Sequence, residues 1–160
     1  MAELDYFLKI DGIQGESTAA KHKGEIEIQA WNWGEHLAGA PAGGGGGSGK
    51  VQMDAFHAMA RTSIASPKLF LACASGQHIK EAVLTAVRRK KGKSQNYLII
   101  KLTDVIVSSY QIGAKEQSTP VDAFDLEFGK IEVEYSPLKD DGSLDAPVTA
   151  GWDVKTNKPV

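Results

Sequence analysis

The sequence predicts a mainly β fold, a sandwich or a barrel, with one short helix. Apolar and polar residues alternate through Asp122–Tyr135, and such alternation is the pattern of half-buried strands. The segments Tyr97–Leu102 and Val105–Tyr110 are rich in β-branched and aromatic residues, which fit a pleated surface. Separate strands with turn signals between them, such as Asp11-Gly12, are typical of sandwiches and barrels.

The first predicted strand, Tyr6–Ile10, is regular, whereas the second, Gly24–Trp33, changes phase partway along. Ile26 and Ile28 lie at even positions, whereas Trp31 and Trp33 lie at odd positions. The apolar face of the strand therefore changes sides around Gln29-Ala30. A one-residue shift is what a β-bulge produces, and bulges cluster at barrel rims and functional surfaces. We expect Asn32 to project away from the tryptophans and the core; the alternative is an ordinary surface asparagine.

A glycine-rich tract, Gly39–Lys50, follows this strand. Gly44–Lys50 matches the spacing of a phosphate-binding loop, but Val51 stands where a Ser or Thr should bind Mg²⁺. A linker between domains fits poorly, because it would leave about 40 residues before it, close to the lower limit for independent folding. The tract is therefore predicted to be a long loop that joins two strands of one domain, and such loops usually carry a function.

The strand candidate Val51–Met59 precedes the one clear helix, at about residues 66–76. Ser66 suits the N-cap, and Pro67 suits the first helical position, where its missing N–H costs nothing. Gly76 can end the helix in the left-handed conformation. The predicted apolar stripe consists of Leu69, Phe70 and Cys73.

The segment Ile79–Lys90 is ambiguous. Its composition favours a helix, since Ile79, Val83 and Val87 recur at a spacing of four. The alternation between residues 83 and 87 equally suits a strand, and from the residues alone we favour the helix. The basic run at 88–93 is interpreted as a solvated strand end and turn, because no aromatic residues interleave to stack bases.

The C-terminal part continues the β pattern. Within the alternating segment Asp122–Tyr135, one face carries Phe124, Leu126 and Phe128, and after Gly129 the apolar set becomes Ile131, Val133 and Tyr135. The tail from residue 136 to residue 160 carries the turn Asp140-Asp141-Gly142 and a late tryptophan, Trp152. We expect this tryptophan to pack back onto the sheet.

Composition excludes several classes of function. At 160 residues, 42% of them hydrophobic, the chain is one domain by size and can bury roughly 70% of its unfolded surface. A net charge of −2 gives no electrostatic case for nucleic acid. No apolar run approaches 18 residues, so no membrane insertion is expected. The acidic opening residues lack the pattern of a secretory signal, so export would need a route that accepts the folded protein.

A search for catalytic or metal-binding sets finds almost nothing. The four histidines show no zinc-site spacing and have no cysteine partners. His22 and His36 lie in polar segments of the sequence that are typical of loops, which predicts solvated side chains. Cys73 is the single cysteine, which excludes an internal disulfide and predicts a small buried hydrophobe. We expect no enzyme activity, no cofactor and no metal.

Several ordered motifs together resemble one family. The chain opens with YFLKIDGIQGES and continues with AWNWG, a glycine run ending in GKV, and SPKLFLACASG. YLIIKLTDVIVSS, FGKIEVEY and GWDV complete the set. In this order the motifs resemble the Hcp (hemolysin-coregulated protein) family of bacterial type VI secretion systems, over essentially the whole chain. The ordered set is specific, above all AWNWG with the glycine run.

The resemblance implies a compact β-barrel of two packed antiparallel sheets with one flanking helix, forming a single domain over residues 1–160. It also implies that Ile79–Lys90 is a strand, and we adopt that prediction. Copies would form homohexameric rings that stack into a tube inside a contractile sheath on a baseplate. A spike protein would cap the tube, and small effector proteins would lie in its lumen. The protein would assemble in the bacterial cytoplasm and be secreted without a signal peptide.

The resemblance gives two residue sets a role. Asn32 matches a position that faces the lumen and contacts cargo. The glycine-rich loop would reach neighbouring subunits or the next ring, through Gly39, Gly43, Gly44, Gly45, Gly46, Gly47, Ser48, Gly49 and Lys50. The stretch His57–Ala65 departs from the Lys/Asp pairing often seen in relatives, which leaves local contacts between subunits open. The alternatives are a stand-alone β-barrel binding module and an enzyme that binds nucleotide at the glycine loop.

Overall fold

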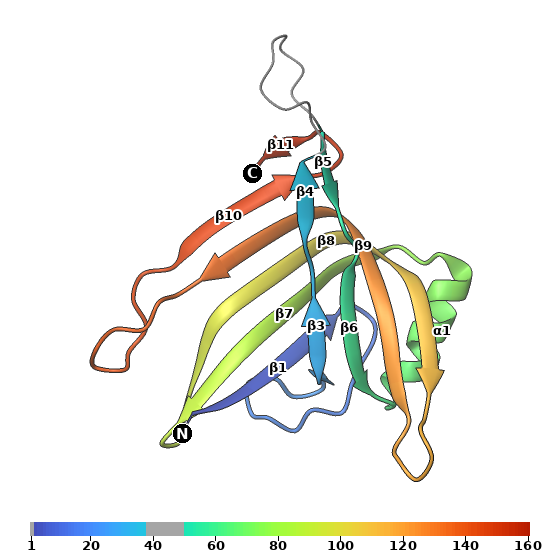
Figure 1. Cartoon of the computed structure of the whole chain (residues 1–160), viewed down its shortest axis with the longest axis horizontal. Coiled ribbons are helices and arrows are strands. Elements are labelled where there is room, and N and C mark those ends of the chain that lie inside the picture. Colours follow the sequence, from blue (N-terminus) through green and yellow to red (C-terminus); the bar gives the residue numbers. More distant parts are fainter. Residues whose placement is uncertain (1, 38–49) are drawn as a thin grey trace.

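The computed structural model describes residues 2–37 and 50–160. These residues form a mainly β structure with a single helix, as the sequence predicts (Figure 1). In chain order the elements are β1 (Glu3–Ile10), β2 (Ile26–Ile28), β3 (Ala30–Asn32), β4 (Glu35–Leu37), β5 (Val51–Met53), β6 (Phe56–Arg61), α1 (Ala65–Ser75), β7 (Ile79–Lys90), β8 (Lys93–Gly113), β9 (Val121–Tyr135), β10 (Val148–Asp153) and β11 (Lys158–Pro159).

The main strands close into a barrel. Antiparallel pairing runs from β1 through β7, β8 and β9 to β6, and β6 pairs with β3. On its other side β1 pairs with β2. Because β2 and β3 are separated only by Gln29, the circuit returns to its starting strand. The chain at Gln29, and not strand pairing, completes this circuit, so among the described residues β3 and the last part of β8 each keep one unpaired edge.

The long strands β8 and β9 belong to two sheets that pack against each other. One sheet contains β3, β6, the first half of β9 and the last part of β8. The other contains β2, β1, β7, the first part of β8 and the second half of β9, extended by β10 and β11. We call the first, which contains β3, the Asn32 sheet, and the second the rear sheet. Both are parts of one hydrogen-bonded nine-stranded sheet that folds on itself, while β4 and β5 pair with each other in a separate two-stranded sheet. The predicted mainly β barrel of antiparallel strands is confirmed.

The core lies between the two sheets and under α1. Burying one such large apolar side chain stabilises the fold by about 1.5–3 kcal/mol, and both sheets and the helix contribute. The largest fully buried apolar side chains of this core are Leu8, Phe56, Leu69, Leu84, Leu102, Val105, Phe124 and Leu126.

The helix α1 confirms one predicted boundary and corrects the other. Gly76 ends it in the left-handed conformation, with φ of 64°. The N-cap position belongs to Ile64, which makes no side-chain cap, so the N-cap prediction for Ser66 was wrong. Ser66 is instead buried within the first turn. The predicted stripe was wrong at Phe70, whose side chain is 60% exposed.

Segment Ile79–Lys90 is the strand β7, which confirms the prediction adopted from the family resemblance. The helix favoured by its composition alone was wrong. The strand lies between β1 and β8 and is hydrogen-bonded to both, and such tertiary pairing overrides a weak local propensity. The two strands predicted on either side of residues 103–104 are one strand, β8. Asp104 adopts a left-handed conformation within it, with φ of 59°, and does not end it.

The phase shift at Gln29 also proves larger than a bulge. The chain bends there and exchanges partners, from β1 on one side to β6 on the other. The Gln29 backbone N–H donates to the Met59 carbonyl at 2.8 Å. The shift therefore marks the point at which the chain passes from one sheet to the other.

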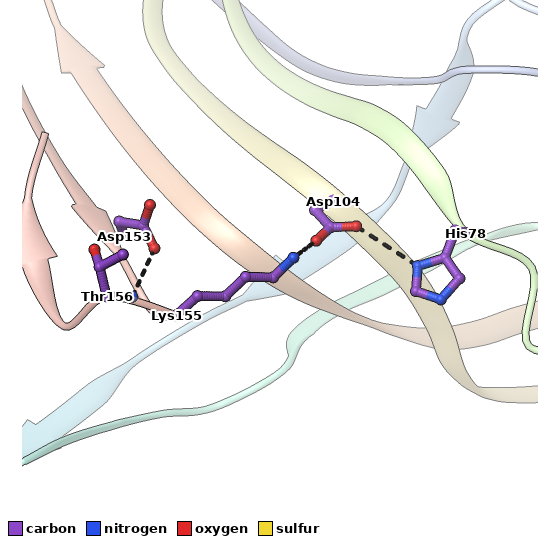
Figure 2. Close-up of polar contacts among 5 residues, drawn as sticks. All are labelled: His78, Asp104, Asp153, Lys155 and Thr156. Carbon is purple, nitrogen blue, oxygen red and sulfur yellow. Dashed lines mark hydrogen bonds and ion pairs between the residues drawn. The ribbon is translucent and has the colours of Figure 1, made fainter.

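The C-terminal tail folds back on the barrel, as expected for Trp152, which packs against the core. Figure 2 shows how the final turn is anchored: Lys155 reaches across to the carboxylate of Asp104, and the Nδ1 atom of His78 lies 3.6 Å from the same group. Within the turn, the Thr156 N–H donates to Asp153 at 3.0 Å. A Cβ at Gly129 would lie 2.9 Å from the Lys155 Cε atom, so a side chain there would force the flexible Lys155 to shift.

Candidate functional site

Asn32 lies on the outward face of the Asn32 sheet. Its neighbours Trp31 and Trp33 pack against the core, and the Trp31 ring stacks on Phe56 with centroids 5.8 Å apart. The Trp33 indole N–H donates to the Asp54 carbonyl at 3.0 Å. Successive residues of a strand point to opposite faces, and Asn32 is exposed as the sequence predicts.

Strand register extends this position into a polar row. Asn32 pairs with His57 in β6, His57 pairs with Asp125 in β9, and Asp125 pairs with Ser109 in β8. Directly opposed residues share one face of a sheet. We call Asn32, His57, Asp125 and Ser109 the polar row.

The centre of the polar row is a short hydrogen bond. The Nδ1 atom of His57 lies 2.6 Å from Oδ1 of Asp125, and the two side chains are 36% and 33% exposed. With the carboxylate ionised, Nδ1–H donates to it, which leaves Nε2 to accept a hydrogen bond from a ligand. Asp125 thus orients the ring, while Asn32 beside it can both donate and accept.

A β-bulge adjoins the row. The register between β8 and β9 shifts between Val107 and Ser109, opposite Asp125. The Ser108 hydroxyl is 3.4 Å from the Asp125 carbonyl oxygen, a weak contact. Bulges redirect side chains and recur beside functional surfaces. The row therefore offers a set of hydrogen-bonding groups on an irregular part of the sheet.

A second carboxylate of β9 lies on the inner face. Asp122 is 1% exposed and accepts hydrogen bonds from the hydroxyls of Thr62 at 2.9 Å, Tyr110 at 3.3 Å, and Ser66. Burial, with the neighbouring Asp122 charge, raises the pKa of the Tyr110 phenol above its ordinary value. We call these four residues the Asp122 clamp; it ties the start of α1 to β8 and β9.

The histidines are placed differently from the prediction in one case. His36 is exposed and contacts Gln52 at 3.1 Å. His22 is buried, so its predicted solvation was wrong. Its ring stacks on Phe7 with centroids 4.6 Å apart, and Nδ1 lies 3.0 Å from a Glu25 oxygen. The polar residues around His22 in the sequence predicted a solvated ring, but its aromatic partner, Phe7, comes from strand β1 and is distant in the sequence.

The predicted loop residues are mostly outside the described part of the chain. Lys50 is described and lies exposed just before β5. The other members lie outside the described residues: Gly39, Gly43, Gly44, Gly45, Gly46, Gly47, Ser48 and Gly49.

Sequence reasoning predicted the outward position of Asn32 but did not identify the other members of the polar row. Residues alternate between the two faces along β9, and Phe124 and Leu126 are buried. The sequence therefore indicates that Asp125, which lies between them, points outward. That His57 lies beside it follows only from the pairing of strands far apart in the chain.

Within residues 2–37 and 50–160, no three His, Cys, Asp or Glu side chains gather as a metal site would require. In the same residues no helix has the length and apolarity needed to cross a membrane. The amide, imidazole, carboxylate and hydroxyl groups of the polar row can between them donate and accept hydrogen bonds with a ligand.

Comparison with known proteins agrees with these features. Residues 7–135 match the family described as "Type VI secretion system effector, Hcp". The chain is 38% identical over 158 residues to Protein hcp1 of Pseudomonas aeruginosa, which covers 96% of this chain and 97% of that protein.

Solved structures give the same result. One described as a type six secretion system protein superposes with a TM-score of 0.90 and 31% identity, covering 99% of this chain and 100% of that one. Hcp1 from Salmonella typhimurium has a TM-score of 0.80 and 33% identity, with 100% of both chains covered. The chain therefore belongs to the Hcp family of type VI secretion system proteins.

Proposed function

We propose that this chain is a structural subunit of the type VI secretion inner tube, acting as a single domain without enzymatic activity. Six copies form a ring, rings stack, and the lumen carries and stabilises small effector proteins. The tube assembles in the cytoplasm within sheath and baseplate proteins, and is secreted with the spike when the sheath contracts. Membership of the Hcp family supports this assignment.

The observation that carries the proposal is the Asn32 sheet, which combines a hydrogen-bonding outward face with two open sides. Among the described residues, β3 pairs only with β6, and residues 106–113 of β8 pair only with β9. Unpaired edges invite association. Two different edges on one chain suit the head-to-tail contacts that close a ring, and such a ring can turn the outward face of this sheet toward its axis.

The polar row supplies the contacts for cargo in this proposal. A single hydrogen bond from Asn32 or His57 contributes only about 1 kcal/mol. Six rows around one axis can engage one enclosed protein together, and such multivalency increases retention without stronger individual contacts. Weak contacts also allow release once the tube has left the cell.

The glycine-rich loop is proposed to contact neighbouring subunits or the next ring. Glycine permits close approach of one backbone to another. Replacing Gly43–Gly47 with Ser-Pro repeats should impair stacking of rings more than their formation, measured as tube length against ring count in electron micrographs. Equal losses in both, or none, would refute this role.

The test of cargo contact uses Asn32→Trp and Asn32→Gln, with the same changes at the exposed Asn96 in the rear sheet as matched controls. Native mass spectrometry should show rings for all four variants. The amount of effector that co-purifies should fall for the Asn32 variants alone. If the Asn32 variants retain as much effector as the Asn96 variants, Asn32 does not contact cargo.

The same measurement separates the proposal from a stand-alone binding module. A module of that kind would give a monomer mass at every concentration. Rings with no dependence on Asn32 would support the tube and reject the cargo contact.

A further inference from the structure

A groove lies between the β4–β5 hairpin and strands β9 and β10. Its volume is about 570 Å³, and its lining includes Trp33, Leu37, Met53, Val133 and Trp152. Leu37 is 68% exposed. An apolar groove with exposed walls is typical of a surface that another element covers.

One polar group in the groove lacks a partner. The Trp152 Nε1 atom is shielded from solvent, and no acceptor among the described residues lies within hydrogen-bonding distance. A buried donor without an acceptor is costly. Because this atom is itself covered, the contacts that an occupant of the groove can make are with the apolar side chains of the lining.

The helix α1 has a composition that suits such an occupant. It buries Ala65, Leu69 and Ala72 against its own barrel, yet Phe70 and Leu71 are 60% and 55% exposed. A surface helix normally directs its large apolar residues inward. The outward face of α1 is therefore an unpartnered apolar surface.

Charge indicates that these two surfaces fit each other. Lys68 is the only charged residue of α1, and its side chain is on the exposed half of the helix. Among the described residues that line the groove, Glu35 is the only Asp, Glu, Lys or Arg. Each surface thus combines apolar side chains with one charge, and the two charges are opposite.

We propose that the groove beneath the β4–β5 hairpin receives α1 of a second copy of this chain. No residue of α1 lines the groove of its own chain, and Figure 1 shows the helix and the hairpin at separate sides of the barrel. Two different surfaces on one chain give a head-to-tail contact that can repeat and close into a ring. The inference rests on the proposed self-assembly and names one contact that produces it.

Disulfide trapping tests the contact directly. In a Cys73→Ser background, Phe70→Cys is combined with Ala150→Cys, which lies in the groove. Mild oxidation should convert most chains to covalent multimers that reductant reverses. The control pair combines Phe70→Cys with Ser118→Cys, in an exposed turn outside the groove lining, and should give little product. Equal yields from both pairs would overturn the proposal.

Substitution tests the energetics. Phe70→Glu should raise the concentration at which rings dissociate about 30-fold or more, as expected for loss of a central apolar anchor. Because Phe70 is exposed, the thermal unfolding of the dissociated chain should not change. Lys68→Glu and Glu35→Lys should each raise that concentration about three- to tenfold, and the double variant should restore it.

The outcomes separate this inference from the function on which it rests. If the wild-type chain is a monomer at every concentration, both fail. If the wild type forms rings and Phe70→Glu and the charge swaps leave them intact, self-assembly holds and the groove does not receive α1. Rings that lose stability only through variants of groove residues would assign the groove to another occupant and would also overturn the proposal.

Discussion

Asp122 and Asp125 lie on the same strand, β9, and face opposite sides of one sheet. Asp122 is fully buried and accepts three hydroxyl hydrogen bonds. Asp125 is half-buried and engages one ring nitrogen of His57. The first carboxylate has its partners within the chain, whereas the second orients a histidine whose other nitrogen is open.

The difference shows how one strand separates stability from recognition. A buried carboxylate must have its hydrogen bonds satisfied by the fold, so the Asp122 clamp fixes where α1 begins. A carboxylate on the outward face remains partly solvated, and its loss costs the fold little. We therefore expect substitutions in the clamp to act on stability, and substitutions in the polar row to act on binding.

The largest expected effect comes from Asp122→Ala. Three hydroxyls lose their shared acceptor, so the free energy of unfolding should fall by about 2–4 kcal/mol. Urea denaturation of the monomeric chain measures it. The matched control is Asp125→Ala on the outward face of the same strand. Equal losses from the two variants would remove the distinction between inner and outer carboxylates.

A smaller loss is expected from Ser66→Ala. The Ser66 hydroxyl donates to Asp122 and accepts from the Ser63 N–H at 2.9 Å. Removing it should cost about 1–2 kcal/mol, and amide hydrogen exchange should accelerate first in the opening turn of α1. Unchanged exchange in that turn would show that Ser66 does not anchor the helix.

Tyr110→Phe should cost about 0.5–1 kcal/mol, since it removes one hydrogen bond of 3.3 Å to the clamp. Because the pKa of Tyr110 is raised in the folded state, the fold keeps the phenol proton at a pH where the unfolded chain loses it. Stability should therefore fall as pH rises above about 10. Denaturation at about pH 9 and pH 11 should show a weaker decline for Tyr110→Phe. Identical declines would contradict a raised pKa of Tyr110 in the folded chain.

The smallest effect on stability is expected from His57→Gln, below about 0.5 kcal/mol, because the pair with Asp125 is partly exposed. Retention of effector by assembled rings should nevertheless fall. Nitrogen NMR of wild-type His57 should show a proton on Nδ1, and Asp125→Asn should weaken that preference. A proton held on Nε2 in the wild type would contradict the proposed orientation of the ring.

Much of the fold could be predicted because its signals are local. Alternation in Asp122–Tyr135 and the glycine at the end of α1 depend on neighbouring residues only. The helix preferred for Ile79–Lys90 was wrong because two flanking strands decide its conformation. The shift at Gln29 was located correctly, but its cause, an exchange of partner strands, is a property of the whole barrel.

In the candidate site, too, some features follow from local sequence and others depend on the pairing of distant strands. The outward direction of Asn32 follows from the parity of its tryptophan neighbours. The pairing of His57 with Asp125 joins residues 68 positions apart, and no local pattern carries that information. The groove and the apolar face of α1 likewise emerge only when distant segments are brought together.

Electron microscopy of the purified wild-type chain is the most direct test that it closes around a hollow axis with copies of itself. We expect annular particles with six-fold symmetry and the Asn32 sheet facing the central hole. Solitary compact particles at every concentration, or rings with the Asn32 sheet on their outer wall, would contradict the account.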